Sequence, residues 1–184
     1  MAVPNPALPY GMRDIKVTPI TANIAAAITY GTMVDLPAAQ TLSWNTTEDY
    51  EQVRGDDIVQ GEHGNGRLIE WELAAGGIGI DAVAVIMGGT VSSTGTTPAI
   101  VKKLETLGTT AAPYFRIDGQ AINDNGGDTK VVIYRAKATG GFEGAFEDGT
   151  FMSTGISGNG YPNADNKLMD ILSYETATNI AQPV

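Results

Sequence analysis

Hydrophobic and polar residues alternate along much of the chain, a pattern that predicts β-strands with one buried and one solvated face. The longest alternation covers residues 41–51, where Leu42, Trp44 and Tyr50 share one parity and polar side chains share the other. A second alternating run covers residues 67–73, with apolar side chains at every odd position from 69. We therefore expect a long hairpin over residues 41–74, and we expect its core side to carry Leu42, Trp44, Ile69, Trp71 and Leu73.

Glycine, Asn and Asp mark the breaks between the expected elements. Residues 55–57 predict the turn of the hairpin, and the glycine-rich residues 61–66 predict a loop before its second strand. Residues 123–128, Asn-Asp-Asn-Gly-Gly-Asp, predict another turn. Further strands are expected at residues 13–18, 100–107, 114–122, 130–139, 150–157 and 168–174.

Two segments leave the type of element open. Residues 78–88 form an apolar run closed by glycine, which favours a short buried helix, although a buried strand has the same pattern. Residues 21–31 combine alanines that favour a helix with Thr and Ile that suit a strand or a packed loop. The expected fold is mainly β, an antiparallel β-sandwich or barrel with one short flanking α-helix. Residues 1–184 are expected to form one domain with an N-terminal arm (1–12) and a C-terminal tail (175–184).

Composition excludes several classes of function. The chain carries 21 acidic and 11 basic residues, a formal charge of -10, so its field repels the phosphates that most DNA- and RNA-binding proteins neutralise. It has no cysteine, which excludes disulfides, thiolate nucleophiles and zinc sites built on sulfur. We expect no secretory signal and no membrane insertion, because the sequence contains neither a basic start before an apolar run nor a long apolar stretch.

The negative charge is concentrated in the expected hairpin. Residues 48–72 hold eight acids and two bases, which accounts for -6 of the total -10. Such a stretch is either an ordinary solvated face or a negative surface with a function.

Residue types that perform catalysis are scarce. His63 is the only histidine and lies in the glycine-rich stretch 61–66, where a solvated side chain is the expected state. That stretch does not match the dinucleotide fingerprint, and no phosphate-binding loop motif occurs. Residues 123–128 offer oxygen ligands but lack a calcium-binding loop, so a turn is favoured. Glu70 and Glu72 share one strand face, which suits a charged surface better than a catalytic pair. We therefore expect no catalytic, cofactor-binding or metal-binding residue.

Several segments resemble the major tail tube proteins of long, non-contractile-tailed bacteriophages. The similar segments are R-D-I-K-V at 13–17, V-D-L-P-A-A-Q at 34–40, V-R-G-D-D at 53–57, I-G-I-D-A-V-A-V-I-M-G-G-T-V at 78–91, and the C-terminal segments 130–134, 142–147 and 150–160. The resemblance covers most of the chain, and it rests on the order and spacing of these segments.

The resemblance implies a structural virion protein of the phage tail, assembled in the host cytoplasm into stacked hexameric rings. Tape measure, tail terminator and baseplate or tail tip proteins would be its partners, and double-stranded DNA would pass through the tube without specific binding. A set of polar residues would then face the lumen: Thr41, Ser43, Asn45, Asp49, Glu51, Glu70 and Glu72. Residues 53–66 and the arm 1–12 would contact neighbouring subunits or rings, with the loop contacts made by Arg54, Gly55, Asp56, Asp57 and His63.

Three other classes of protein remain as alternatives. A tube protein of a contractile or type VI secretion system would share the fold. A capsid decoration domain would form trimers or monomers, not rings. A carboxylate-dependent hydrolase would need a deep pocket lined by acidic residues.

Overall fold

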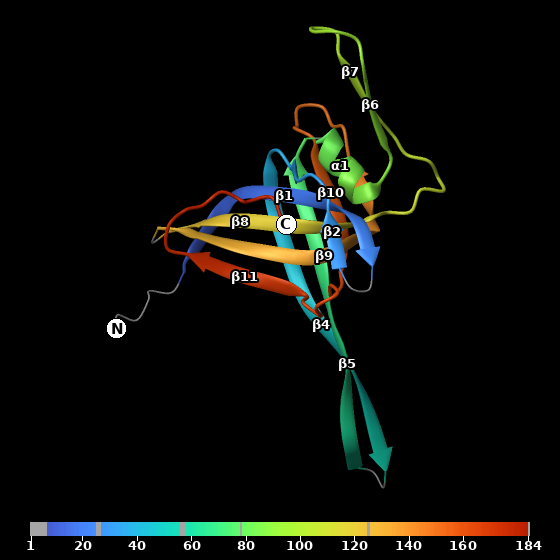
Figure 1. Ribbon diagram of the computed structural model, residues 1–184, viewed down its shortest axis with the longest axis vertical. Helices are drawn as coiled ribbons and strands as arrows, with labels where there is room; N and C mark the ends of the chain where they lie inside the picture. The colour runs from blue at the N-terminus through green and yellow to red at the C-terminus, as the bar shows by residue number, and fades with distance from the viewer. Residues whose placement is uncertain (1–6, 25–26, 56–57, 78, 125, 184) are drawn as a thin grey trace.

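The computed structural model describes residues 7–24, 27–55, 58–77, 79–124 and 126–183 (Figure 1). Strands dominate this part of the chain, and one helix lies among them. The elements are β1 (Pro9–Ile24), β2 (Ala27–Tyr30), β3 (Val34–Asp35), β4 (Ala39–Gly55), β5 (Ile58–Gly76), α1 (Ile80–Met87), β6 (Thr90–Thr94), β7 (Val101–Glu105), β8 (Tyr114–Asn123), β9 (Asp128–Gly144), β10 (Ser153–Gly160) and β11 (Met169–Tyr174).

The main sheet folds over on itself at β9, which belongs to two layers. The first half of β9 pairs with β8 on one side and β11 on the other. Its second half pairs with β10, and the path continues through β5 to β4. The first layer therefore contains β2, β3, β1, β8, β9 and β11, whereas the second contains the end of β9 with β10, β5 and β4. All of these pairings are antiparallel.

The two layers pack face to face, as expected for an antiparallel β-sandwich with a short helix. In Figure 1 β8, β11 and the first half of β9 run across the view, and β4, β5 and β10 run steeply past them. Both layers send apolar side chains into one core, among them Ile15, Ile69 and Ile117, which are fully buried. The rings of Trp71 from β5 and Phe115 from β8 form a T-shaped pair, with 5.6 Å between centroids and 83° between planes. The alternation along each strand thus places one face of each layer in the core.

Close packing of Trp71 requires a glycine on β10. A Cβ on Gly158 would overlap both the backbone oxygen of Lys137 and the ring of Trp71. We expect Gly158→Ala to lower the free energy of unfolding by about 2 kcal/mol, because neither group can move without distorting the sheet. Gly155→Ala on the same strand is the matched control, since a Cβ there meets nothing within 4 Å. Chemical denaturation of both variants measures the difference, and equal stabilities would contradict this packing argument.

Helix α1 covers one end of the sandwich. Ala82 and Ile86 lie four residues apart on one face of the helix and are fully buried in the core. The helix ends where Gly88 takes a positive φ of 79° and its N–H donates to the carbonyl of Ala84 at 3.0 Å. The helix expected over 78–88 thus spans 80–87, and Ile78 lies outside the described residues. No helix in the described part of the chain has the length and apolar character to cross a membrane.

Two antiparallel ribbons project from opposite ends of the sandwich (Figure 1). At one end the β4–β5 hairpin extends far beyond the layers. At the other end β6 and β7 form a separate two-stranded sheet next to α1. The sequence pattern did not predict β6, because residues 88–94 carry too few apolar side chains to alternate.

The expected loop at residues 61–66 is wrong, because these residues continue β5. His63 pairs with Glu51 and Gly64 with Tyr50, so the hairpin stays paired through the glycine-rich stretch. The register shifts between the Glu48–Arg67 and Tyr50–Gly64 pairs, and Gly66 has a positive φ of 93°. The glycine-rich stretch therefore forms a β-bulge, and the strand continues on both sides of it.

Residues 21–31 resolve in favour of strands. The end of β1 pairs with β2 from Ala22 opposite Thr29 to Ile24 opposite Ala27, and residues 25–26 lie outside the described part. The expected N-terminal arm is shorter than predicted, because Pro9, Tyr10 and Met12 already pair with β8. Cross-strand pairing places both segments in strands, and it outweighs the helix preference of the alanines in residues 21–31.

Candidate functional site

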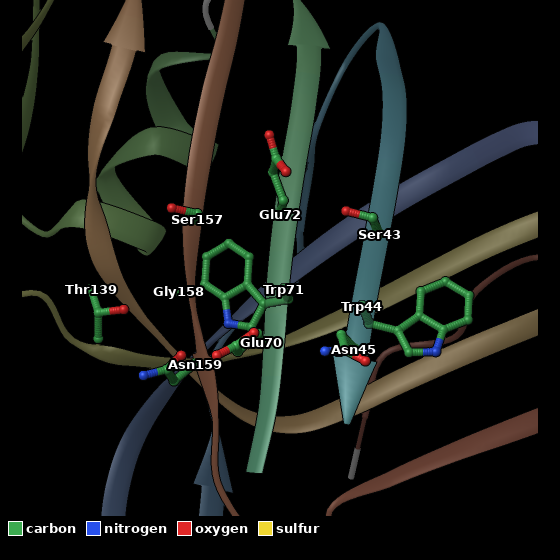
Figure 2. Close-up of a pocket in the computed structure, with 10 residues that line it drawn as sticks. All are labelled: Ser43, Trp44, Asn45, Glu70, Trp71, Glu72, Thr139, Ser157, Gly158 and Asn159. Atoms are coloured by element: carbon green, nitrogen blue, oxygen red, sulfur yellow. The ribbon is translucent and has the colours of Figure 1, made fainter. Parts of the chain in front are cut away.

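The outward face of the second layer gathers polar side chains in rows that cross its strands. One row joins Ser43, Glu72 and Ser157 on β4, β5 and β10. The next row joins Asn45, Glu70 and Asn159 and continues to Lys137 on β9. A third row runs from Thr41 through Ala74 and Gly155 to Glu143. We call this surface the polar face, and Figure 2 shows its centre.

The polar face carries a small negative charge. Glu70, Glu72 and Glu143 are exposed carboxylates on it, and Lys137 is the base in its rows. The ammonium of Lys137 lies 5.2 Å from the centroid of the Tyr114 ring at the margin of the face. Apart from Ala74 and Gly155, the remaining residues of the rows carry hydroxyls or amides. Such a surface exposes many hydrogen-bond acceptors to water, and its charge opposes the close approach of phosphate groups.

A hollow of about 420 Å³ lies on the polar face, lined by Ser43, Trp44, Asn45, Glu70, Trp71, Glu72, Thr139, Ser157, Gly158 and Asn159 (Figure 2). Its titratable side chains are the two glutamates, which stand two residues apart on one strand. Ser43 and Ser157 flank Glu72 in one row, but within the described part of the chain no hydrogen bond joins either serine hydroxyl to a glutamate. Among the described residues, no three acidic or histidine side chains come together where they could hold a metal ion.

The structure brings most of the predicted lumen residues together. Thr41, Ser43 and Asn45 on β4 are exposed on the same face as Glu70 and Glu72 on β5. Asp49 and Glu51 are also exposed but lie further along the hairpin, outside these rows. Asp49 borders a different hollow, of about 800 Å³, between the hairpin and residues 162–169. Whether any of these side chains faces a lumen stays a prediction.

Sequence reasoning missed the half of the polar face that lies on β10 and β9: Lys137, Thr139, Glu143, Ser157 and Asn159. The signal was present in Ser-Gly-Asn-Gly at residues 157–160, where polar side chains alternate with glycine. Because those glycines lie under Trp71 and Ile69, the strand has one small buried face and one polar exposed face. Only the pairing of β10 with β5 reveals that this polar side extends the acidic one.

Trp44 was expected in the core, and this expectation is wrong. It faces the same side as its cross-strand partner Trp71, yet it is 40% exposed whereas Trp71 is 2% exposed. The difference follows from position, because β4 is the last strand of its layer and β5 lies between two neighbours. Trp44 instead borders an apolar hollow of about 220 Å³ that Leu42, Met12 and Val131 also line. The other predicted core residues Leu42, Ile69, Trp71 and Leu73 are buried.

The four-stranded second layer has two open edges. Among the described residues β4 pairs with β5 alone, which leaves its other edge unpaired over its whole length. At the opposite side, the end of β9 beyond Lys137 pairs only with β10 within the described chain. Unpaired strand edges expose rows of N–H and C=O groups that readily accept another strand.

The projecting part of the β4–β5 hairpin is acidic and exposed. Arg67 donates to Glu48 at 2.8 Å, and this hydrogen bond holds the pKa of the Glu48 carboxyl below its usual range. The neighbouring Glu48 carboxylate in turn raises the pKa of Tyr50. His63 and Arg54 are exposed on this part of the hairpin, where contacts between subunits were predicted. Gly55 ends β4 opposite Ile58, and Asp56 and Asp57 lie outside the described residues.

A second polar cluster fastens the C-terminal segment to the first layer. The fully buried carboxyl of Asp128 accepts hydrogen bonds from Gln120 Nε2 at 2.5 Å, the Thr178 N–H at 2.6 Å and Arg13 at 3.3 Å. Lys130 donates to Thr178 Oγ1 at 2.9 Å and to the Asn179 carbonyl at 3.0 Å. We call residues 175–183 the C-terminal strap.

The strap continues across the fold to the N-terminal strands. Ile180 is buried, and the Gln182 side chain accepts from the Met33 N–H at 2.8 Å and donates to the Gly31 carbonyl at 2.7 Å. Burial lowers the pKa of Lys130 and, together with a hydrogen bond to Asp170, raises the pKa of Tyr134 to about 12. Both groups have partners within the fold, because Lys130 donates to the strap and Tyr134 donates to Asp170 on β11.

Residues 123–128 form a turn as expected. The Gly126 N–H donates to the Asn123 carbonyl at 3.1 Å, and both Gly126 and Gly127 have positive φ angles. Asn123 and Asp128 use their side chains within the fold, where Asn123 accepts from Thr129 at 2.7 Å. Asn125 lies outside the described residues.

No protein-family model matches the chain, and no curated protein is significantly similar to it in sequence.

Proposed function

We propose that this chain is the major tail tube subunit of a long, non-contractile phage tail, a structural protein whose copies form rings around a lumen that conducts DNA. The observation that carries this proposal is the second layer, a four-stranded sheet with one core-packed face, one polar face and two open edges. The family resemblance of the sequence supplies the biological setting.

The open edges favour closure into a ring. If the free edge of β4 on one copy paired with the free end of β9 on the next, each copy would contribute four strands to a shared barrel. Such a contact joins two different surfaces, and it closes into a ring when the rotation between successive copies is a whole fraction of a full turn. Six copies would give 24 strands, which at about 4.8 Å spacing and a tilt of about 40–45° form a barrel about 50 Å across. Such a barrel is wide enough for a DNA duplex, about 20 Å across, to pass after side chains are added.

The polar face would then line the barrel, because the other face of this layer is occupied by the core. Glu70, Glu72 and Glu143 would present carboxylates to the passing duplex. A basic wall would retain DNA by releasing counterions, whereas an acidic or neutral wall allows it to slide. The rings would stack into a tube in the virion tail, where the tape measure, tail terminator and baseplate or tail tip proteins are its partners.

Assembly state tests the proposal directly. We expect sedimentation of the concentrated protein to show a hexamer or longer assemblies, and negative-stain electron microscopy to show rings or tubes with a central hole. A stable monomer at high concentration would contradict the proposal, and a trimer would favour a capsid decoration domain.

Charge reversal tests the lumen assignment separately. We expect assembled rings of Glu70→Lys/Glu72→Lys to bind linear duplex DNA at least about tenfold more tightly at low salt than wild-type rings, because lysines in the lumen release counterions. Filter binding across a salt series measures this affinity.

Glu147→Lys/Glu175→Lys is the matched control, since it changes the net charge equally at exposed sites outside the polar face. Equal DNA affinity of the two double variants would show that DNA contacts the polar face no more closely than it contacts the rest of the surface.

A further inference from the structure

The two projecting ribbons suggest how copies associate along the long axis. The acidic ribbon is the projecting part of the β4–β5 hairpin, described over residues 48–55 and 58–67. The lysine ribbon is β6 and β7 with their flanks, residues 90–107. Figure 1 shows them at opposite ends of the longest dimension of the molecule.

Each ribbon exposes apolar side chains that the subunit itself does not cover. On the acidic ribbon these are Tyr50, Val53, Ile58 and Val59, each more than half exposed. On the lysine ribbon they are Ile100, Val101 and Leu107, also more than half exposed. A lone two-stranded ribbon is marginally stable in water, so both ribbons gain stability from a partner surface.

The charges of the ribbons are opposite. Residues 48–67 contain six acids and two bases, a net charge of -4. Within the described residues, no base is ion-paired with Asp49, Glu51 or Glu62. Residues 90–107 contain Lys102, Lys103 and Glu105, a net charge of +1 in a chain of -10. Lys102 pairs with Asp81 and Lys103 with Glu105 at 2.7 Å, and both lysine side chains remain substantially exposed.

We propose that the acidic ribbon of one copy docks on the lysine ribbon of the next copy along the long axis. Charge selects this pairing, because two acidic ribbons would repel each other, whereas Lys102 and Lys103 attract the unpaired carboxylates. The contact joins different surfaces at opposite ends, so it repeats from copy to copy and builds an open-ended stack. This inference rests on the proposed tube and identifies the contact that would join successive rings.

Engineered cysteines provide the test, and the cysteine-free chain makes the result unambiguous. Val53→Cys/Val101→Cys places one thiol on each exposed ribbon, at opposite ends of the molecule. A disulfide between these positions must therefore join two copies. After mild oxidation of the assembled protein, we expect a ladder of covalent oligomers on a non-reducing gel, which collapses on reduction.

The control is Val53→Cys/Glu147→Cys, which moves the second thiol to an exposed connection between β9 and β10. It should give no ladder, and each single-cysteine variant can give no species larger than a dimer of linked copies. Equal ladders from the two double variants, or dimers alone from Val53→Cys/Val101→Cys, would overturn the inference.

Charge reversal separates this inference from the proposed function. Lys102→Glu/Lys103→Glu should eliminate stacked tubes while single rings persist in electron micrographs, and adding Glu51→Lys/Glu62→Lys to the same chain should restore stacking. Tubes unaffected by Lys102→Glu/Lys103→Glu would refute the ribbon contact and leave the ring proposal standing. A disulfide ladder from a protein that forms no rings would refute the ring proposal and leave the ribbon contact standing. Circular dichroism checks that each variant is folded.

Discussion

Replacing Trp71 by alanine is expected to lower the free energy of unfolding by about 4 kcal/mol and the melting temperature by about 10 °C. Trp71 is 2% exposed, and its ring joins the two layers through Phe115. The variant would leave a cavity that the glycine-containing strand β10 cannot fill. Thermal and chemical denaturation of the purified protein measure both quantities.

Trp44→Ala is the matched control, because the two tryptophans are cross-strand partners that face the same side of the hairpin. Trp44 is 40% exposed at the edge strand, so we expect its loss to cost about 1 kcal/mol. A comparable decrease in the free energy of unfolding for the two variants would show that Trp44 on β4 is buried as Trp71 on β5 is. If that occurred only under conditions where rings form, it would indicate burial of Trp44 between copies.

Asp128→Ala is expected to lower the free energy of unfolding by about 3 kcal/mol and to release the C-terminal strap. The buried carboxyl of Asp128 accepts from Gln120, Thr178 and Arg13, so its removal leaves buried donors without a partner. Denaturation measures the stability. Hydrogen exchange of the peptide that contains Thr178 measures the release, which should appear as faster exchange under native conditions.

Asp35→Ala is the control that tests whether removal of any carboxylate lowers the stability and releases the strap. Asp35 pairs with Lys16 at 2.9 Å on the surface, and the hydrogen bond from Lys16 lowers its pKa. The small contribution of this ion pair to the free energy of unfolding is therefore present at neutral pH, and it is lost as the pH falls through the lowered pKa of Asp35 in the folded state. At pH 7 we expect a loss under about 1 kcal/mol and unchanged exchange in the strap. Faster exchange in the strap of this variant would contradict a specific role for Asp128.

Local patterns predicted most strands and the helix correctly. The odd-numbered apolar positions of residues 67–73 become the buried face of β5, and the glycine after residue 87 ends α1 where expected. These elements were predictable because side-chain alternation and a helix stop are properties of a few consecutive residues. The acidic character of the hairpin could also be predicted, because the charge of a segment is counted from its own residues.

Glycine was the main source of error. Residues 61–66 looked like a loop, yet pairing with β4 carries β5 through them with one bulge. On β10 the glycines make room for Trp71 and Ile69, which lie on a strand about 90 residues earlier in the chain. A glycine count cannot distinguish a turn from a strand that a large neighbour presses against, because that neighbour is distant in sequence.

The amino-acid sequence by itself determined the faces of the hairpin, the helix, the turn at residues 123–128 and the location of the negative charge. The tertiary structure alone decided which strands from distant parts of the chain became neighbours. Pairing of β10 with β5 extended the acidic face with Ser157 and Asn159, and the edge position of β4 exposed Trp44. Packing of residues 175–183 on the first layer gave Asp128 its partners. The reason is physical, because burial and hydrogen bonding depend on residues far apart in the chain, whereas alternation and charge are local.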